Sequence, residues 1–179
     1  MSMKKGKTTD AGSLPWFLTK PDPQIYLTGT YATLDFEIDA PDPGTYGHAR
    51  VADNRLVCGY IHYSGDDKFH LVRNELELST HFDRLLAVDF LIAQNAKYEL
   101  CWLQRGGFPT HEVLTYDTRI GDYVRSGNRQ GFAGGRYGLD LDTICRRYDV
   151  PTKSSLVSGL LKSGARAGEI PASLLRYYC

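Results

Sequence analysis

The alternation of apolar and polar residues early in the chain predicts three β-strands. Residues 31–38 (YATLDFEI) alternate between the two kinds, as a strand with two different faces does. The apolar residues on both sides of each acid indicate a central strand of a sheet. Residues 56–64 (LVCGYIHYS) and 68–72 (KFHLV) predict two further strands, separated by the turn signal GDDK.

After residue 74, the pattern changes to helical spacing with one more strand. Leu78, Phe82, Leu85 and Leu86 recur at intervals that predict a helix over residues 75–89. The remaining pattern predicts a buried strand over 90–94 and helices over 96–107, 115–127, 141–150, 154–164 and 170–179.

This order of elements predicts a single α/β domain in which a mixed β-sheet is flanked by α-helices. Residues 1–24 are expected to form a flexible lead-in, and residues 25–179 the folded domain. The helical pattern of 170–179 continues to the last residue without a capping signal. We therefore expect the domain to be truncated at its C-terminal end.

Composition limits the possible functions. The 21 basic residues equal the 21 acidic residues in number, which argues against a nucleic-acid binder that relies on Lys and Arg alone. No apolar run approaches the ~18 residues of a membrane span, and residues 1–13 lack the apolar core of a signal peptide. We therefore expect a cytoplasmic protein that is neither secreted nor bound to a membrane.

The first strand carries two carboxylates one residue apart, Asp35 and Glu37. Residues i and i+2 of a strand lie on the same face, so the two charges repel unless a cation lies between them. Mg²⁺ prefers such oxygen ligands, and a pair of ions about 4 Å apart can hydrolyse a phosphodiester. The alternative is a solvated strand face with two acids, which the apolar neighbours in 31–38 disfavour.

A second polar segment follows the strand predicted over 90–94. Asn95 comes directly after it, and Tyr98 and Glu99 stand at the beginning of the next helix. In the simplest interpretation, Glu99 is an acid that stabilises the first turn of a helix through the helix dipole.

Together these segments resemble the motifs of DEDD 3′–5′ exonucleases, which include the proofreading domain of family A DNA polymerases, RNase D and Werner-type nucleases. The family's D-x-E motif is matched by DFE at 35–37, and its N-x-x-(F/Y)-D motif by NAKYE at 95–99. The segments YDTRIGDYV (116–124) and GLDLDTICRRYDVPTK (138–153) follow in the family's order. The resemblance covers the chain from about Tyr31 to its end, and it implies a ribonuclease H-like sheet flanked by helices.

The resemblance also implies two Mg²⁺ or Mn²⁺ ions as cofactors. Asp35 would bridge both ions, Glu37 would hold one, and Glu99, which replaces the family's usual Asp, would support the second through water. Tyr178, or Tyr177 in the alternative register, would orient the attacking water. The family's last Asp follows this tyrosine by four residues, which is beyond the end of the chain.

Two residues are implied to bind substrate: Asn95, and Phe36 inside the first motif. Asp117 also matches a family position, but we interpret it as the N-cap of the next helix.

The sequence thus leads to one principal hypothesis and two alternatives. The principal one is a metal-dependent 3′–5′ exonuclease that acts on the 3′ end of single-stranded DNA during replication in a bacterial or phage-infected cell, joined to a polymerase domain in the full-length chain. One alternative is an RNase D-like exoribonuclease. The other is a catalytically inactive module that binds single strands.

Overall fold

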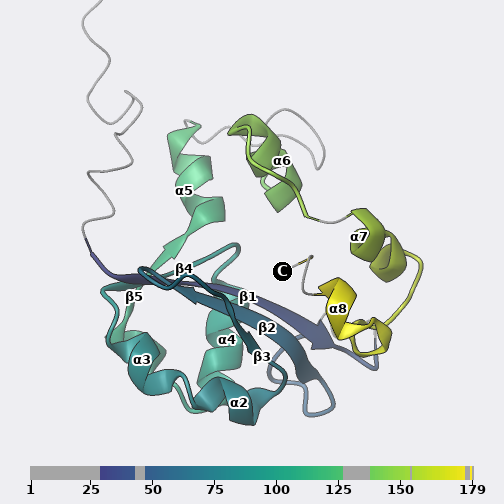
Figure 1. The fold of residues 1–179 in the computed structure, drawn as a ribbon, viewed down its shortest axis with the longest axis horizontal. Coiled ribbons are helices and arrows are strands. Elements are labelled where there is room, and N and C mark those ends of the chain that lie inside the picture. Colours follow the sequence, from purple (N-terminus) through teal and green to yellow (C-terminus); the bar gives the residue numbers. More distant parts are fainter. Residues whose placement is uncertain (1–28, 43–46, 127–137, 154, 176–177, 179) are drawn as a thin grey trace, which may run out of the picture.

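A five-stranded mixed β-sheet forms the centre of the computed structural model, which describes residues 29–42, 47–126, 138–153, 155–175 and 178 (Figure 1). The strand order is β3-β2-β1-β4-β5; β2 is antiparallel to both of its neighbours, whereas β4 is parallel to β1 and to β5. The strands are β1 (Tyr31–Asp39), β2 (Arg55–Tyr63), β3 (His70–Val72), β4 (Phe90–Ala93) and β5 (Leu114–Asp117).

Helices cover both faces of this sheet (Figure 1). One face carries α2 (Glu75–Ser79), α3 (Phe82–Leu86) and α4 (Lys97–Arg105). The other face carries α5 (Thr118–Arg125), α6 (Leu141–Arg147), α7 (Ser155–Lys162) and α8 (Ala172–Leu175). Two short 3₁₀ turns complete the description, η2 (Thr110–Glu112) and η3 (Ala167–Glu169). The expected α/β architecture is therefore confirmed, whereas the expected lead-in over residues 1–24 lies outside the described residues.

The central strand β1 has the two-faced character that its sequence predicts. Ala32, Leu34 and Phe36 are buried, and the residues between them are only partly buried. The buried set packs against α2–α4 in the larger of two apolar cores, which also contains Trp102 and Leu103 of α4. The odd-numbered residues of β1, including both acids, consequently face the second layer of helices.

The second layer has a smaller core. Cys58 and Tyr60 of β2 pack there against Val157 of α7, Ile170 and Leu175. An irregularity in the β1–β2 pairing between Glu37 and Ile38 shifts the register, so that Leu56 faces the larger core although Cys58 faces the smaller one.

The helix predicted over residues 75–89 is wrong in its length, because α2 and α3 are separate. The Ser79 hydroxyl donates to the Leu76 carbonyl at 2.7 Å, and the Thr80 hydroxyl donates to the Glu77 carbonyl at 2.7 Å. Such side-chain bonds compete with the backbone bonds that would continue a helix, and the chain turns here.

The helix predicted within residues 115–127 begins at Thr118, after its expected cap Asp117, but the residues before it, Leu114–Asp117, form strand β5, which was not predicted. This edge strand has only four residues, and Leu114 and Tyr116 are exposed. On α5, Ile120 and Val124 share a face but are exposed as well. An alternation of only four residues is too short to be distinguished from the helical pattern that follows it.

The last predicted helices are shorter in the structure. The helix α6 ends at Arg147, and Asp149 has a left-handed backbone (φ +56°) that ends the helical path. Tyr148, which follows the last residue of α6, is 37% exposed. Among the described residues, no helix has the length and apolarity that crossing a bilayer requires.

Candidate acidic site

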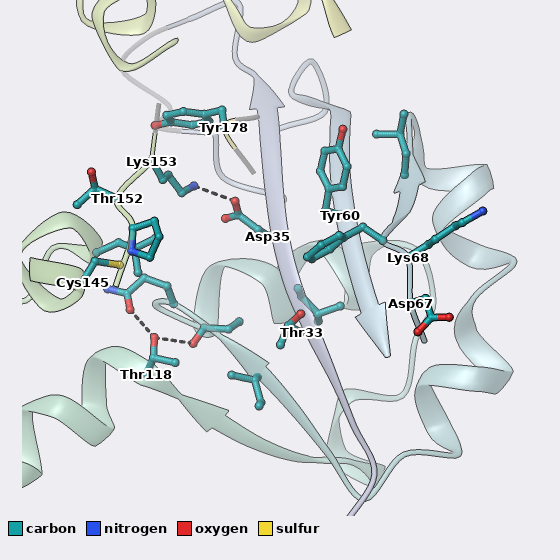
Figure 2. A pocket seen from close by; sticks show the side chains of 18 residues that line it. Thr33, Asp35, Tyr60, Asp67, Lys68, Thr118, Cys145, Thr152, Lys153 and Tyr178 are labelled. Atoms are coloured by element: carbon teal, nitrogen blue, oxygen red, sulfur yellow. Dashed lines mark hydrogen bonds and ion pairs between the residues drawn. The ribbon is translucent and has the colours of Figure 1, made fainter. Parts of the chain in front are cut away.

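Asp35 and Glu37 lie on one face of β1 and share a cation, the ammonium group of Lys153. The Lys153 Nζ atom is 2.8 Å from Asp35 Oδ2 (Figure 2). It is 3.6 Å from Glu37 Oε1. The contact of both acids with one atom confirms that they lie on the same face. In the structure, the cation between the two acids is a side chain of the protein, whereas the metal ions implied by the family resemblance stay a prediction.

The carboxylates around Lys153 determine its protonation state. Burial by itself lowers the pKa of an ammonium group, but the Asp35 and Glu37 carboxylates outweigh burial and raise the pKa of Lys153 above its usual value. Lys153 is therefore a permanent cation at physiological pH, and only 19% of its side chain is exposed.

A pocket of about 800 Å³ opens beside this cluster on the second face of the sheet. Asp35, Lys153 and Tyr178 lie on one side of it, and Tyr60 on the other (Figure 2). The Tyr178 ring centroid is 4.5 Å from Lys153 Nζ, which is the geometry of a cation–π contact. The structure thus brings Tyr178 to the acid pair, whereas Tyr177 lies outside the described residues.

Glu99 is buried at the beginning of α4, with 4% of its surface exposed. Its Oε2 atom has no hydrogen-bond partner among the described residues. Burial raises the pKa of Glu99 to about 8, and the nearby Asp35 carboxylate acts in the same direction. Glu99 is thus within electrostatic reach of the acid pair, but it does not line the pocket.

A glycine fixes α4 against the connection between β1 and β2. Gly47 has a left-handed backbone (φ +67°), and a Cβ atom there would lie 2.5 Å from the Tyr98 hydroxyl oxygen. The Trp102 indole donates to the Gly47 carbonyl at 3.1 Å. A larger residue at position 47 would have to displace the Tyr98 side chain and adopt a strained backbone.

Asn95 lies in the turn between β4 and α4. It has a left-handed backbone (φ +59°), and its side-chain oxygen accepts from Arg119 at 3.3 Å. It is exposed and does not line the pocket, whereas its neighbour Gln94 does, together with Thr118. The Thr118 hydroxyl donates to the Gln94 side-chain oxygen.

Phe36, the other residue expected to bind substrate, is buried in the core. Its side chain is 3% exposed and belongs to the larger core, on the face of β1 opposite to Asp35. A Cβ atom at Gly59 of β2 would lie 2.7 Å from the Phe36 ring, so the ring is held by close packing. Alternation along the strand makes Phe36 a core residue for the same reason that it places Asp35 and Glu37 in the site.

Asp117 has the structural role that was expected. Its carboxylate caps α5 by accepting from the backbone of Arg119 at 2.8 Å and Ile120 at 3.4 Å. The same carboxylate accepts from the backbone of Asn95 at 3.1 Å and Ala96 at 2.9 Å. Asp117 thus joins the start of α5 to the connection that leads into α4 and Glu99.

We predict that Asp117→Ala lowers the free energy of unfolding by about 2–3 kcal/mol, because it removes a helix cap and leaves two further N–H groups without an acceptor. Asp140→Ala is the matched control, because Asp140 caps α6 through Thr143 alone, accepting from its backbone nitrogen at 2.9 Å and from its hydroxyl at 2.7 Å. The control should cost about 1 kcal/mol. Urea unfolding of both variants measures the difference, and equal losses would contradict the bridging role of Asp117.

The donor chemistry of the acid pair fits Mg²⁺ or Mn²⁺, which prefer carboxylate oxygens. The buried Oε2 atom of Glu99 is a further uncommitted oxygen. Within the described ranges, however, no three Asp, Glu, His or Cys side chains are grouped as a metal ion would require. A metal ion at Asp35 and Glu37 would therefore have to take the place of Lys153.

Lys153 is the functional residue that sequence reasoning missed. It is 118 positions from Asp35 along the chain and lies between α6 and α7, in a connection without helix or strand structure. Its only sequence signal was its place at the end of the segment 138–153, which resembles the exonuclease family.

The chain was also compared with known proteins. No protein-family model matches it, and no curated protein sequence matches it.

Proposed function

We propose that the chain is a ribonuclease H-like 3′–5′ exonuclease domain that hydrolyses single-stranded DNA from its 3′ end with Mg²⁺ or Mn²⁺. The observation that supports this most strongly is the convergence of Asp35, Glu37 and Tyr178 on one cation position beside a pocket. These three residues belong to two motifs that are more than 140 positions apart in the sequence. The mixed sheet flanked by helices is compatible with this fold.

In this proposal, Asp35 and Glu37 hold the metal, which when bound supplies an activated water and stabilises the leaving oxygen. Asp35 and Glu37 lie on a strand that pairs on both sides, so their backbone positions are fixed. Tyr178 faces the same position and would orient the attacking water through its hydroxyl group.

The pocket suits the end of a single strand in size and lining. A volume of about 800 Å³ is within the range of pockets that hold small organic ligands, about 300–1,000 Å³. Phe69 on its rim is 65% exposed, and its ring lies 6.5 Å from the Tyr60 ring. Exposed aromatic rings bind single strands by stacking on the bases.

The experiment that tests the proposal is hydrolysis of a single-stranded oligonucleotide with Mg²⁺ or Mn²⁺. We expect a 5′-labelled DNA strand to shorten one nucleotide at a time and a 3′-labelled strand to release a labelled mononucleotide at once. Where the gene encodes residues beyond Cys179, the longer product should be assayed in parallel. An RNA strand of the same sequence tests the exoribonuclease alternative.

The inactive binding module is the second candidate, because Lys153 already neutralises the acid pair. The binding module would be favoured if the chain binds the oligonucleotide without metal, and if neither the chain nor the longer gene product cleaves it. Internal cuts, or release from the 5′ end, would contradict the exonuclease proposal.

A further inference from the structure

Lys153 lies between Asp35 and Glu37, but the backbone that carries it is less constrained than the strand that carries the two acids. The two carboxylates project from a strand with a paired neighbour on each side. Lys153, in contrast, is carried by residues 150–153, which make no helix and no strand. The anionic part of the cluster is therefore fixed by the sheet, and the cationic part lies on a connection that can move without breaking an element.

Lys153 and a divalent ion differ in the charge that they would bring to this position. The ammonium group brings one positive charge to the carboxylates of Asp35 and Glu37. A divalent ion at the same position would bring two, so it would bind the carboxylates more strongly than a single positive charge does. The ammonium group and a metal ion cannot occupy the position together, because each needs the same oxygen atoms.

We propose that Lys153 is a built-in competitor of the metal ion: it neutralises the acid pair when metal is absent, and Mg²⁺ or Mn²⁺ binds by displacing it into the pocket. Lys153 thereby sets the metal concentration at which the site is loaded. The inference rests on the proposed function only in naming a divalent ion as the ligand.

The first test measures Mn²⁺ binding to the whole chain by following free Mn²⁺ with electron paramagnetic resonance. Lys153→Met keeps the length of the side chain and removes its charge, so we expect Mn²⁺ to bind about tenfold more tightly or better. Lys153→Arg keeps the charge and should bind Mn²⁺ much as the wild type does. Adding Asp35→Asn to Lys153→Met should abolish the gain in Mn²⁺ affinity. This result would show that the additional affinity arises at the acid pair.

The proposal is overturned if Lys153→Met binds Mn²⁺ no more tightly than the wild type, or if its gain survives the Asp35→Asn change. A gain of equal size in Lys153→Arg would also overturn it, because charge would then not be the cause.

A second test uses the wild-type chain and does not depend on the folding of a variant. The reaction of lysines with an acetylating reagent is followed by mass spectrometry, with and without Mg²⁺. Lys153 should react slowly without Mg²⁺ and several times faster with it, because displacement exposes its amine. Lys162 on α7 is exposed and is the internal control, whose rate should not change. An unchanged rate at Lys153 with Mg²⁺ bound would overturn the proposal.

Failure of this inference can be distinguished from failure of the proposed function. Displacement of Lys153 by Mg²⁺ without any cleavage would leave the inference intact and remove the exonuclease assignment. Cleavage of the oligonucleotide, together with an Mn²⁺ affinity that does not depend on residue 153, would support the exonuclease assignment and overturn the inference about Lys153.

Discussion

The double replacement of Asp35 by Asn and Glu37 by Gln is expected to abolish metal-dependent cleavage of the oligonucleotide. Both changes keep the shape of the side chain and remove the negative charge that a divalent ion needs. Changes to groups that merely support metal ligands lower activity by about 10–100-fold, so the loss of two ligands should exceed that range. The measurement is the initial rate of nucleotide release at saturating Mn²⁺.

Asp39→Asn is the matched control for this experiment. Asp39 is on the same strand and the same face, but its carboxylate is paired with Arg166, whose Nε atom is 2.9 Å away. The control should release nucleotides at close to the wild-type rate. If the double variant also releases nucleotides at close to the wild-type rate, the catalytic site must lie elsewhere.

Glu99→Gln is expected to flatten the pH dependence of the free energy of unfolding. The carboxyl group is buried, and its pKa is raised from 4.5 to about 8 in the folded state. The folded state therefore holds the proton over a pH range in which the unfolded state has lost it. The contribution of Glu99 to the free energy of unfolding is fully present below about pH 4.5, and it decreases as the pH rises towards 8. Between pH 5 and 8, the wild type should lose about 3 kcal/mol through Glu99.

Gln cannot ionise, so the free energy of unfolding of the variant should lack this decrease. The variant should therefore become more stable relative to the wild type as the pH rises. His81 changes stability in the opposite direction, because burial lowers its pKa. Comparing the two chains at each pH removes the contribution of His81 from the result. Glu112→Gln, at an exposed position, is the control and should leave the pH profile unchanged. Urea unfolding at pH 5, 6.5 and 8 makes the measurement, and parallel profiles for Glu99→Gln and wild type would show that Glu99 ionises normally.

The sheet and the acid pair could be predicted because their signals are local. Alternation along residues 31–38 places Asp35 and Glu37 on one face within three residues, and no distant contact is needed to find this. The cap at Asp117 was predicted for the same reason, since its partners Arg119 and Ile120 follow directly.

The remainder of the site depends on contacts between distant residues. Asp35 meets Lys153 because the second layer of helices folds back over β1, and nothing near Lys153 in the sequence indicates this. Phe36 shows the opposite error, because a family motif suggested a substrate contact where strand geometry places a core residue. The strand β5 was missed because its alternation covers only four residues and leads directly into the helix α5.

The separation of the site into a strand-borne part and a loop-borne part has a consequence for how such a protein can change in evolution. Insertions, deletions and substitutions are tolerated most readily in connections on the surface. A change within residues 150–153 would replace or remove the lysine while the carboxylates and the sheet stay as they are. Descendants of one ancestor could thus differ in which cation they hold, or in how strongly, provided that some cation still offsets the repulsion between Asp35 and Glu37.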